Sequence, residues 1–319
     1  MQKQFSTPIL LVVFNRPDTT RPVFETIRKL KPKYLFIAAD GPRKNREGDA
    51  EKCRQVKEIF SDIDWPCEVK TLFHEQNLGC KKAESSAFDW FFEHVEMGII
   101  LEDDCLPDQT FFRYCTELLE KYKDNEQVMH ISGNNFQKGN SRFICDESYY
   151  FSTIPNSWGW ATWRRAWAKY DVNIKKWPEF KASGKLKNAF NSHGGYEYWS
   201  KVWDQYYRSE IDSWDGQWVL ACAENNGLCI TPKINLVTNI GWGEDSTHCK
   251  IENSSARVPT VAVAFPLKHP HEIKVNIYAD KYTIREAFNV DSKLHYRLVR
   301  PIKIAFPSFY SAVKKLFGK

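Results

Sequence analysis

Short apolar runs alternate with longer amphipathic stretches along the first third of the chain. The runs at residues 9–14, 34–39 and 98–101 are continuously apolar, which is typical of strands buried on both faces of a parallel sheet. Residues 67–73 form a further strand candidate. Four strands are therefore expected in this third of the chain.

The stretches between these runs have the spacing of amphipathic helices. In the first stretch the apolar residues fall on one helical face, and they are Val23, Phe24, Ile27 and Leu30. Helices are also expected at 48–60 and 80–94, and Asp18 or Thr19 is expected to cap the first helix. This order predicts an α/β fold with a mostly parallel sheet, flanking helices and ligands beyond the carboxyl ends of the strands.

The pattern beyond residue 105 is less regular. A helix is expected at 107–123, a strand at 128–131 and a hairpin through 149–152. Two aromatic stretches punctuated by glycine, at 156–164 and 213–218, are expected to line a pocket. The glycine-rich stretch at 239–248 is expected to form a lid. Two β-like runs are expected after it, at 258–265 and 273–278.

Three consecutive acids, Glu102, Asp103 and Asp104, follow the fourth apolar run. Carboxylates at the end of a buried strand repel one another unless a positive charge lies among them. A hard divalent cation takes oxygen ligands and often holds substrate phosphates, so the pattern favours Mn²⁺ or Mg²⁺. The alternative is an acidic helix start with Pro107 as the first helical residue, which accounts for one or two acids rather than three.

Three other polar residues are expected at the same edge of the sheet. Arg16 and Asp40 follow the first and second strands, and Asn77 lies in the loop after the third. An arginine and several acids at one sheet edge indicate a ligand site. No Gly-x-Gly-x-x-Gly and no Walker sequence follows the first strand, so dinucleotide-binding and P-loop proteins are disfavoured.

The amino-acid composition says more about the cellular compartment of the protein than about its fold. The 319 residues are 42% hydrophobic and 27% charged, as in an ordinary soluble protein, and 15% aromatic with twelve Trp. The nine cysteines form no Cys-x-x-Cys pair, so a reducing compartment is expected rather than a zinc ribbon or disulfide framework. Residues 1–8 do not resemble a signal peptide and no apolar run approaches membrane-spanning length, which favours a cytoplasmic protein.

The net charge of +5 is carried by the C-terminal tail. Residues 292–319 hold seven basic residues and no acid, so the rest of the chain is slightly acidic and no nucleic-acid partner is expected. The tail at 296–319 is also amphipathic, which fits a peripheral contact with the inner face of the cell membrane. A C-terminal helix packed on the domain fits the pattern equally well.

Short segments at the strand ends and in the aromatic stretches occur in an ordered set. They are Asn15-Arg16, Asp40-Gly41, Glu102-Asp103-Asp104 with Pro107-Asp108 and Phe111-Phe112, Ser132-Gly133-Asn134-Asn135, Trp158-Gly159-Trp160, Trp214-Asp215 with Trp218, and Thr231-Pro232-Lys233 before 241–248. The set resembles the GT-A-fold (Rossmann-like) nucleotide-sugar glycosyltransferases, in particular the N-acetylglucosaminyltransferases of complex N-glycan synthesis and their bacterial relatives. It covers roughly residues 8–250.

The resemblance implies that the acid triplet binds a UDP-sugar through a metal ion. Asp104 would be the direct ligand of Mn²⁺ or Mg²⁺, Asp103 would bond the ribose hydroxyls, and Glu102 would contact the sugar. The same resemblance places Asp40 at the uracil and Arg16 in the same nucleotide pocket, near the diphosphate.

Two further donor-side residues are expected near the nucleotide. Asn77 belongs to the loop at the same sheet edge. The family's uracil-binding histidine has no clear counterpart, and Lys82 or its neighbour Lys81 occupies that region. His248 in the lid would reach the metal or the diphosphate, with a surface or packing role as the alternative.

On the acceptor side, the resemblance makes Asp215 the general base that deprotonates the acceptor hydroxyl. The run after Asp215 is one residue longer than the family's, so Asp212 is the alternative base. Three tryptophans and one asparagine are candidate sugar contacts: Trp158, Trp160, Trp218 and Asn134. Ordinary core positions for the tryptophans and a turn for the asparagine are the alternatives.

The expected activity is that of an inverting, metal-dependent glycosyltransferase. It would move an N-acetylhexosamine or hexose from a UDP-sugar to a glycan or lipid-linked glycan acceptor in bacterial capsule or lipopolysaccharide synthesis. The expected regions are a nucleotide-sugar half at 1–131, an acceptor half of the same domain at 132–250, and an extension at 251–319. The rivals are a sugar-1-phosphate nucleotidyltransferase and a catalytically silent glycan-binding protein.

Overall fold

The computed structural model describes residues 4–138, 140–190, 193–241, 258–288 and 290. Its elements, in chain order, are β1 (Ile9–Val13), α1 (Pro17–Leu30), β2 (Tyr34–Ala39), α2 (Asp49–Ile59), η1 (Phe60–Asp62), β3 (Glu68–Phe73), α3 (Cys80–His94), β4 (Met97–Glu102), β5 (Cys105–Pro107), α4 (Thr110–Lys121), β6 (Val128–Ser132), β7 (Tyr149–Ser152), β8 (Trp160–Trp163), α5 (Arg164–Trp167), α6 (Trp177–Ser183), η2 (Lys185–Asn188), α7 (His193–Tyr207), α8 (Asp215–Glu224), β9 (Leu228–Pro232), β10 (Val237–Asn239) and α9 (Ile277–Glu286).

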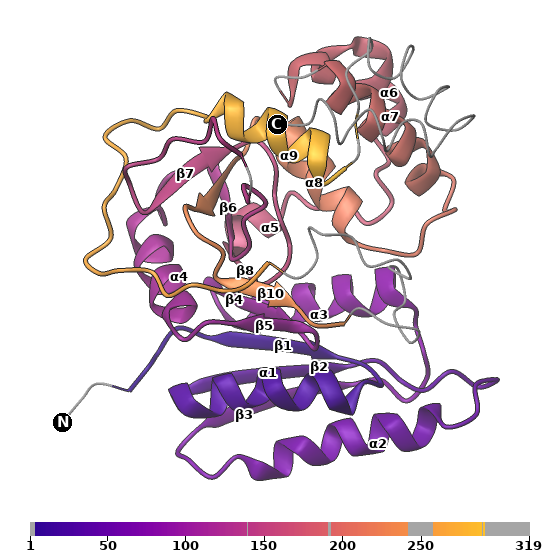
Figure 1. Cartoon of the computed structure of the whole chain (residues 1–319). Coiled ribbons are helices and arrows are strands. Elements are labelled where there is room, and N and C mark those ends of the chain that lie inside the picture. Colours follow the sequence, from indigo (N-terminus) through magenta and orange to yellow (C-terminus); the bar gives the residue numbers. More distant parts are fainter. Residues whose placement is uncertain (1–3, 139, 191–192, 242–257, 289, 291–319) are drawn as a thin grey trace, which may run out of the picture.

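The large sheet has eight strands in the order β3-β2-β1-β4-β8-β6-β9-β7, and β10 and β5 form a separate two-stranded ribbon. Figure 1 shows α1 and α2 beside the first strands at one end of the molecule, and α6 and α7 at the other. Because strands from both sides of residue 131 join the same sheet, the two predicted halves share one structural core.

The first four strands are parallel neighbours, joined by α1, α2 and α3 as predicted. The later strands make the sheet mixed, since β8 runs antiparallel to both β4 and β6, and β7 runs antiparallel to β9. Four of the seven pairings in the large sheet are parallel. The prediction of an α/β fold with a mostly parallel sheet is therefore confirmed.

Alternate residues of β1 face different cores, because successive side chains on a strand point to opposite faces. Ile9, Leu11 and Val13 pack in a cluster with residues of α1, α2 and α4. Leu10 and Val12 pack in a second cluster with residues of α3, α5 and α8. The continuous apolar run thus reflects a strand that is covered on both sides.

Several local predictions are wrong, most of them beyond β4. Pro107 ends β5 instead of opening a helix, and α4 begins at Thr110. The predicted hairpin does not form, because β7 pairs with β9 and not with β6. No strand forms within 258–265, and the run at 273–278 leads into α9. At the start of α1, Arg16 occupies the N-cap position and no side chain caps the helix.

Two further features agree with the sequence. The eight cysteines within the described ranges are all free thiols, in line with the absence of a disulfide framework. Among the helices that the structure describes, none combines the length and apolar character that crossing a membrane requires.

Candidate functional site

Arg16 and the acids after β4 form the centre of the candidate site. The Arg16 guanidinium pairs with both aspartates: Nη2 donates to Asp103 Oδ1, and Nη1 donates to Asp104 Oδ2 at 2.9 Å. The backbone N–H of Phe14, just after β1, donates to the other Asp103 oxygen at 3.2 Å. β1 and β4 are adjacent parallel strands, so their C-terminal ends bring the arginine and the acids together.

The acids are crowded in a poorly solvated place. Burial, with repulsion from Glu84 and the two aspartates, raises the pKa of the Glu102 carboxyl well above its usual value. Burial also raises the pKa of Asp103, although the charge of Arg16 opposes this shift. Such a group of carboxylates favours a bound cation.

The donor atoms near Asp104 suit a hard cation. Ligand atoms of Glu102, Asp104 and Cys105 lie within 4.8 Å of one another. Burial raises the pKa of the Cys105 thiol well above its usual value, and its S–H points to Asp104 Oδ1 at 3.5 Å, so it remains a neutral thiol. The two carboxylates therefore fit Mn²⁺ or Mg²⁺, and the thiol adds no ligand for such an ion.

The chain returns to this site after β10, which pairs antiparallel with β5. The Ile240 N–H donates to the Asp104 carbonyl at 2.8 Å. A Cβ on Gly241 would lie 2.7 Å from Arg16 Nη1 and would collide with Asp104 Oδ2. Only glycine fits this approach without moving the ion pair. His248 and the rest of the predicted lid, from 242 onward, lie outside the described residues.

Asp40 holds the loop after β3 in place. Its carboxylate accepts from Asn77 Nδ2 at 2.7 Å and from the backbone N–H groups of Gly41, Leu78 and Gly79 at 2.8, 2.9 and 3.3 Å. Burial still raises the pKa of Asp40, and these backbone bonds oppose the shift. Asn77 and Asp40 therefore lie together as predicted, but as an internal support for the loop.

Glu84 on α3 is a site residue that the sequence reasoning missed. Cys80 Sγ donates to its Oε1 at 3.2 Å, while Oε2 is buried without a hydrogen-bond partner among the described residues. Burial, together with the charges of Asp103, Asp215 and Asp104, raises the pKa of Glu84 to about 8. A signal existed, because Glu84 interrupts the apolar face of α3 that includes Ala87, Phe88 and Phe91.

Asp215 and Asp212 have different roles in the structure. Asp212 accepts from the backbone N–H groups of Cys80 and Lys81 at 3.1 and 3.0 Å, so it caps the start of α3. Asp215 is the first residue of α8, and its Oδ1 accepts from Tyr206 Oη at 2.9 Å and from Ser213 Oγ. This geometry favours Asp215 over Asp212 as the candidate base.

Trp160 and Trp218 are core residues. Trp160 is 0% exposed, and its ring is stacked on His130 and on Trp214, each with a centroid distance of 5.2 Å. Trp218 is also fully buried, and its Nε1 donates to His130 Nδ1 at 3.1 Å. Stacking of a sugar on these two rings is not supported. Trp158 is half-buried and makes an edge contact with Phe136.

Asn134 and Lys82 are two further residues that the sequence predicted to contact a ligand. Asn134 follows β6 and is 2% exposed, yet neither its Oδ1 nor its Nδ2 has a partner among the described residues. Its neighbour Asn135 instead bonds the Pro232 carbonyl at 2.6 Å. Lys82 is exposed on the first turn of α3. The acceptor role of Asn134 and the nucleotide role of Lys82 stay predictions.

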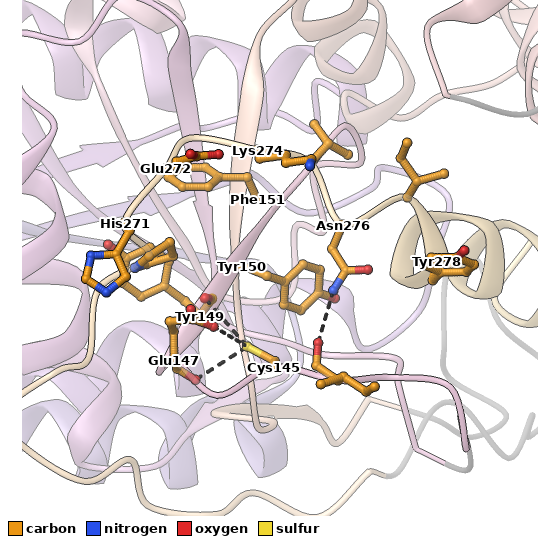
Figure 2. Close-up of a pocket in the computed structure, with 14 residues that line it drawn as sticks. Cys145, Glu147, Tyr149, Tyr150, Phe151, His271, Glu272, Lys274, Asn276 and Tyr278 are labelled. Atoms are coloured by element: carbon orange, nitrogen blue, oxygen red, sulfur yellow. Dashed lines mark hydrogen bonds between the residues drawn. The ribbon is translucent and has the colours of Figure 1, made fainter.

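A separate hollow lies along β7, the outermost strand of the sheet (Figure 2). It measures about 510 Å³, and Tyr149 and Tyr150 line it together with His271, Lys274 and Asn276 from the segment before α9. Four strand spacings of about 4.8 Å separate β7 from β4. This hollow is therefore distinct from the acid-rich site.

No family model matches the chain, and no curated protein matches it. Among solved structures, the mannosyltransferase PcManGT from Pyrobaculum calidifontis, in complex with GDP-Man and Mn²⁺, is 12% identical with a TM-score of 0.36; the match covers 53% of this chain and 49% of PcManGT. TarS 1–349 from S. aureus is 10% identical with a TM-score of 0.40, over 74% of this chain and 60% of TarS.

The galactosyltransferase LgtC, in complex with donor and acceptor sugar analogues, is 10% identical with a TM-score of 0.37, over 91% of this chain and 99% of LgtC. Nucleotidyltransferase structures match as well; 4-diphosphocytidyl-2C-methyl-D-erythritol synthase from Anaerococcus prevotii is 9% identical with a TM-score of 0.36, over 70% of this chain and 88% of that one. The chain spans about half the length of PcManGT. At such low similarity, function has to be argued from the residues of the site.

Proposed function

We propose that this protein is a metal-dependent glycosyltransferase that uses a UDP-sugar. The observation that carries the proposal is the acid group after β4 bonded to Arg16, together with the separate carboxylate of Asp215, which accepts from Tyr206 and Ser213. A diphosphate donor and a hydroxyl acceptor need this combination, which is a cation site for the phosphates and one separate carboxylate for the hydroxyl proton.

On the donor side, Asp104 would hold the cation, with Glu102 close to the same place. Bound Mn²⁺ or Mg²⁺ would supply Lewis-acid neutralisation of the leaving diphosphate. Arg16 offers a planar guanidinium that suits phosphate oxygens, and it already lies beside Asp104. Asp103 would bond the ribose, and the loop supported by Asp40 would lie against the base.

On the acceptor side, Asp215 would accept the hydroxyl proton. Tyr206 and Ser213 both donate to Oδ1, so they hold the carboxylate in one orientation and leave Oδ2 for the incoming hydroxyl. The acceptor oxygen would attack the anomeric carbon opposite the diphosphate, and the bond to the phosphate oxygen would break with its electron pair leaving on UDP. One displacement of this kind inverts the configuration.

The finer substrate assignment follows from the resemblance of the ordered motifs. It proposes an N-acetylhexosamine or hexose donor and a glycan or lipid-linked glycan acceptor in bacterial surface-polysaccharide synthesis. The transfer reaction would take place in the cytoplasm. The tail at 296–319 is the proposed contact with the inner face of the membrane. A sugar-1-phosphate nucleotidyltransferase remains the rival activity, and it would consume a nucleoside triphosphate instead of a UDP-sugar.

Hydrolysis of UDP-sugars with Mn²⁺ tests the proposal without knowledge of the acceptor, because water can take the place of the hydroxyl. We expect Asp215→Asn to lower the hydrolysis rate by about 100-fold or more while UDP affinity is unchanged. Asp212→Asn is the matched control and should retain most of the rate, because asparagine keeps a carbonyl oxygen for the cap. Full activity in Asp215→Asn, or no hydrolysis of any UDP-sugar by the wild type, would contradict the proposal.

A further inference from the structure

β3 lies at one edge of the large sheet, and its outer side has no strand partner in the part of the chain that the structure describes (Figure 1). The opposite edge is β7, where Phe151 forms a bridge with Val275 and the Phe151 carbonyl accepts from the Asn276 N–H at 2.8 Å. Within the described residues, the chain therefore covers one edge of its sheet and leaves the other open. An open edge is a template for pairing with another strand.

Alternate residues of β3 direct their backbone groups away from β2. The two strands are parallel, and the Glu68 N–H donates to the Lys33 carbonyl at 2.8 Å. The same pattern continues to the end of the strand, where the His74 N–H donates to the Ala39 carbonyl at 2.9 Å. In such a ladder every second residue bonds the neighbouring strand, and the residues between them point the other way. The residues that present both N–H and C=O outward are Val69, Thr71 and Phe73.

The same three residues have accessible side chains. Val69 is 39% exposed, Phe73 is 38% exposed, and Thr71 is exposed as well. Proteins often protect an edge strand with a proline or a bulge, but β3 has no proline and its register with β2 is continuous. A lysine can also protect an edge, and Lys70 is the one that β3 has. The edge is therefore regular and partly apolar.

Two copies of β3 are complementary in an antiparallel register centred on Thr71. This register places Thr71 opposite Thr71 of the second copy and Val69 opposite Phe73, so all the outward residues can exchange backbone hydrogen bonds. Thr–Thr pairs and pairs of an aromatic with a β-branched residue are favourable across antiparallel strands. Lys70 then lies opposite Leu72. A register centred on Lys70 would instead set two lysines opposite each other, which is unfavourable.

We propose that β3 is a docking edge for a second copy of this chain, and that two copies join their large sheets through antiparallel β3 strands. The contact uses the same patch on both copies, as a two-fold interface requires. It gives each outward N–H a carbonyl partner and covers the side chains of Val69 and Phe73. A second copy is the expected occupant because the strand is complementary to itself. The inference is independent of the proposed function, since it uses no residue of the candidate site.

Sedimentation velocity of the full-length protein over a concentration series tests the inference. Val69→Lys sets a charge against Phe73 of the second copy. Thr71→Pro removes the central outward N–H, which bonds nothing in β2, so the strand should still form. Val261 is an exposed valine outside β3, so Val261→Lys is the matched control. Melting temperatures show whether each variant stays folded, and Val69→Lys carries the test if the proline unfolds the strand.

We expect the wild type to be a dimer at about 100 µM, and each β3 variant to raise the dimer dissociation constant by about tenfold or more. Val261→Lys should leave this constant unchanged. Hydrogen–deuterium exchange of the wild-type segment 68–73 should slow as the protein concentration rises, because the outward N–H groups become bonded. A monomeric wild type at the same concentration would overturn the proposal. A dimer that neither β3 variant weakens, or that leaves exchange at 68–73 unchanged, would overturn it as well, because its interface would lie elsewhere.

Discussion

His130 lies inside the aromatic core with both ring nitrogens used. Trp218 donates to Nδ1 at 3.1 Å, Nε2 donates to the Asn156 carbonyl at 3.0 Å, and the ring stacks on Trp160. Protonation would place a second N–H against the Trp218 donor. Burial accordingly lowers the pKa of His130 to about 4, although the bond to Asn156 opposes the shift.

His130 should make the protein less stable in mild acid. Between its ordinary pKa of 6.5 and the folded value of about 4, the unfolded chain binds a proton that the folded chain does not. This stability is present above pH 6.5 and is lost as the pH falls, by about 2 kcal/mol near pH 5. Denaturant unfolding of wild type and His130→Gln at pH 7.5 and 5 measures the difference. The exposed His94→Gln is the control, and a wild-type loss that survives in His130→Gln would contradict the assignment.

Gly241 controls the geometry of the Arg16 ion pairs. In Gly241→Ala the new methyl group would press on Arg16 Nη1 and Asp104, so these side chains must move apart. We expect UDP affinity with Mn²⁺ to fall by about tenfold, as for a lost charge-assisted hydrogen bond. Gly184→Ala, at a left-handed glycine before η2, is the control for a general loss of stability. Calorimetry measures the UDP affinity of the two variants. Equal UDP affinities of Gly241→Ala and Gly184→Ala would contradict this view of the site.

The start of α3 connects the two sides of the site. Gly79 precedes the helix with a φ of +82°, and the Asp212 carboxylate accepts from the first two N–H groups of the helix. Asp212 comes three residues before Asp215, so the cap also fixes where α8 begins. The same contact therefore positions Glu84 on one element and Asp215 on the other.

Removal of the Asp212 cap should mainly lower the stability of the protein. Asp212→Ala leaves two N–H groups of α3 without their acceptor, which is expected to lower the free energy of unfolding by about 1 kcal/mol. Denaturant unfolding measures the change, with Glu210→Ala as the control, because Glu210 is exposed and pairs only with nearby Arg208 among the described residues. If Asp212→Ala unfolds like the wild type yet loses all hydrolysis, Asp212 rather than Asp215 is the base.

Over the whole molecule, the local patterns predicted the first half of the fold well. Continuous apolar runs and helical spacing are properties of neighbouring residues, so β1, β2 and β4 and the helices between them could be derived. The strand pairings of the second half could not be derived, because they join segments that are distant in sequence. β8 lies between β4 and β6, and β7 lies beside β9. The aromatic residues of β8 pointed to a pocket, whereas the structure buries them.

The candidate site was predictable to a similar degree. Strand ends on parallel neighbours meet at one edge, so Arg16, Asp103 and Asp104 could be placed together from the sequence. Glu84 could not be placed at the site in this way, because a single acid on an apolar helix side does not reveal which residues it contacts. The choice between Asp215 and Asp212 also depends on contacts, which only the folded chain shows.

Binding of UDP by calorimetry, with and without Mn²⁺, on wild type and Asp104→Asn tests the central claim most directly. The account predicts that UDP binds the wild type more tightly when Mn²⁺ is present, and that Asp104→Asn abolishes this metal dependence. Asp108→Asn, near the start of α4, is the matched control, and it should behave as the wild type. Absence of UDP binding, or UDP binding that is indifferent to both metal and Asp104, would contradict the assignment of a donor site at the end of β4.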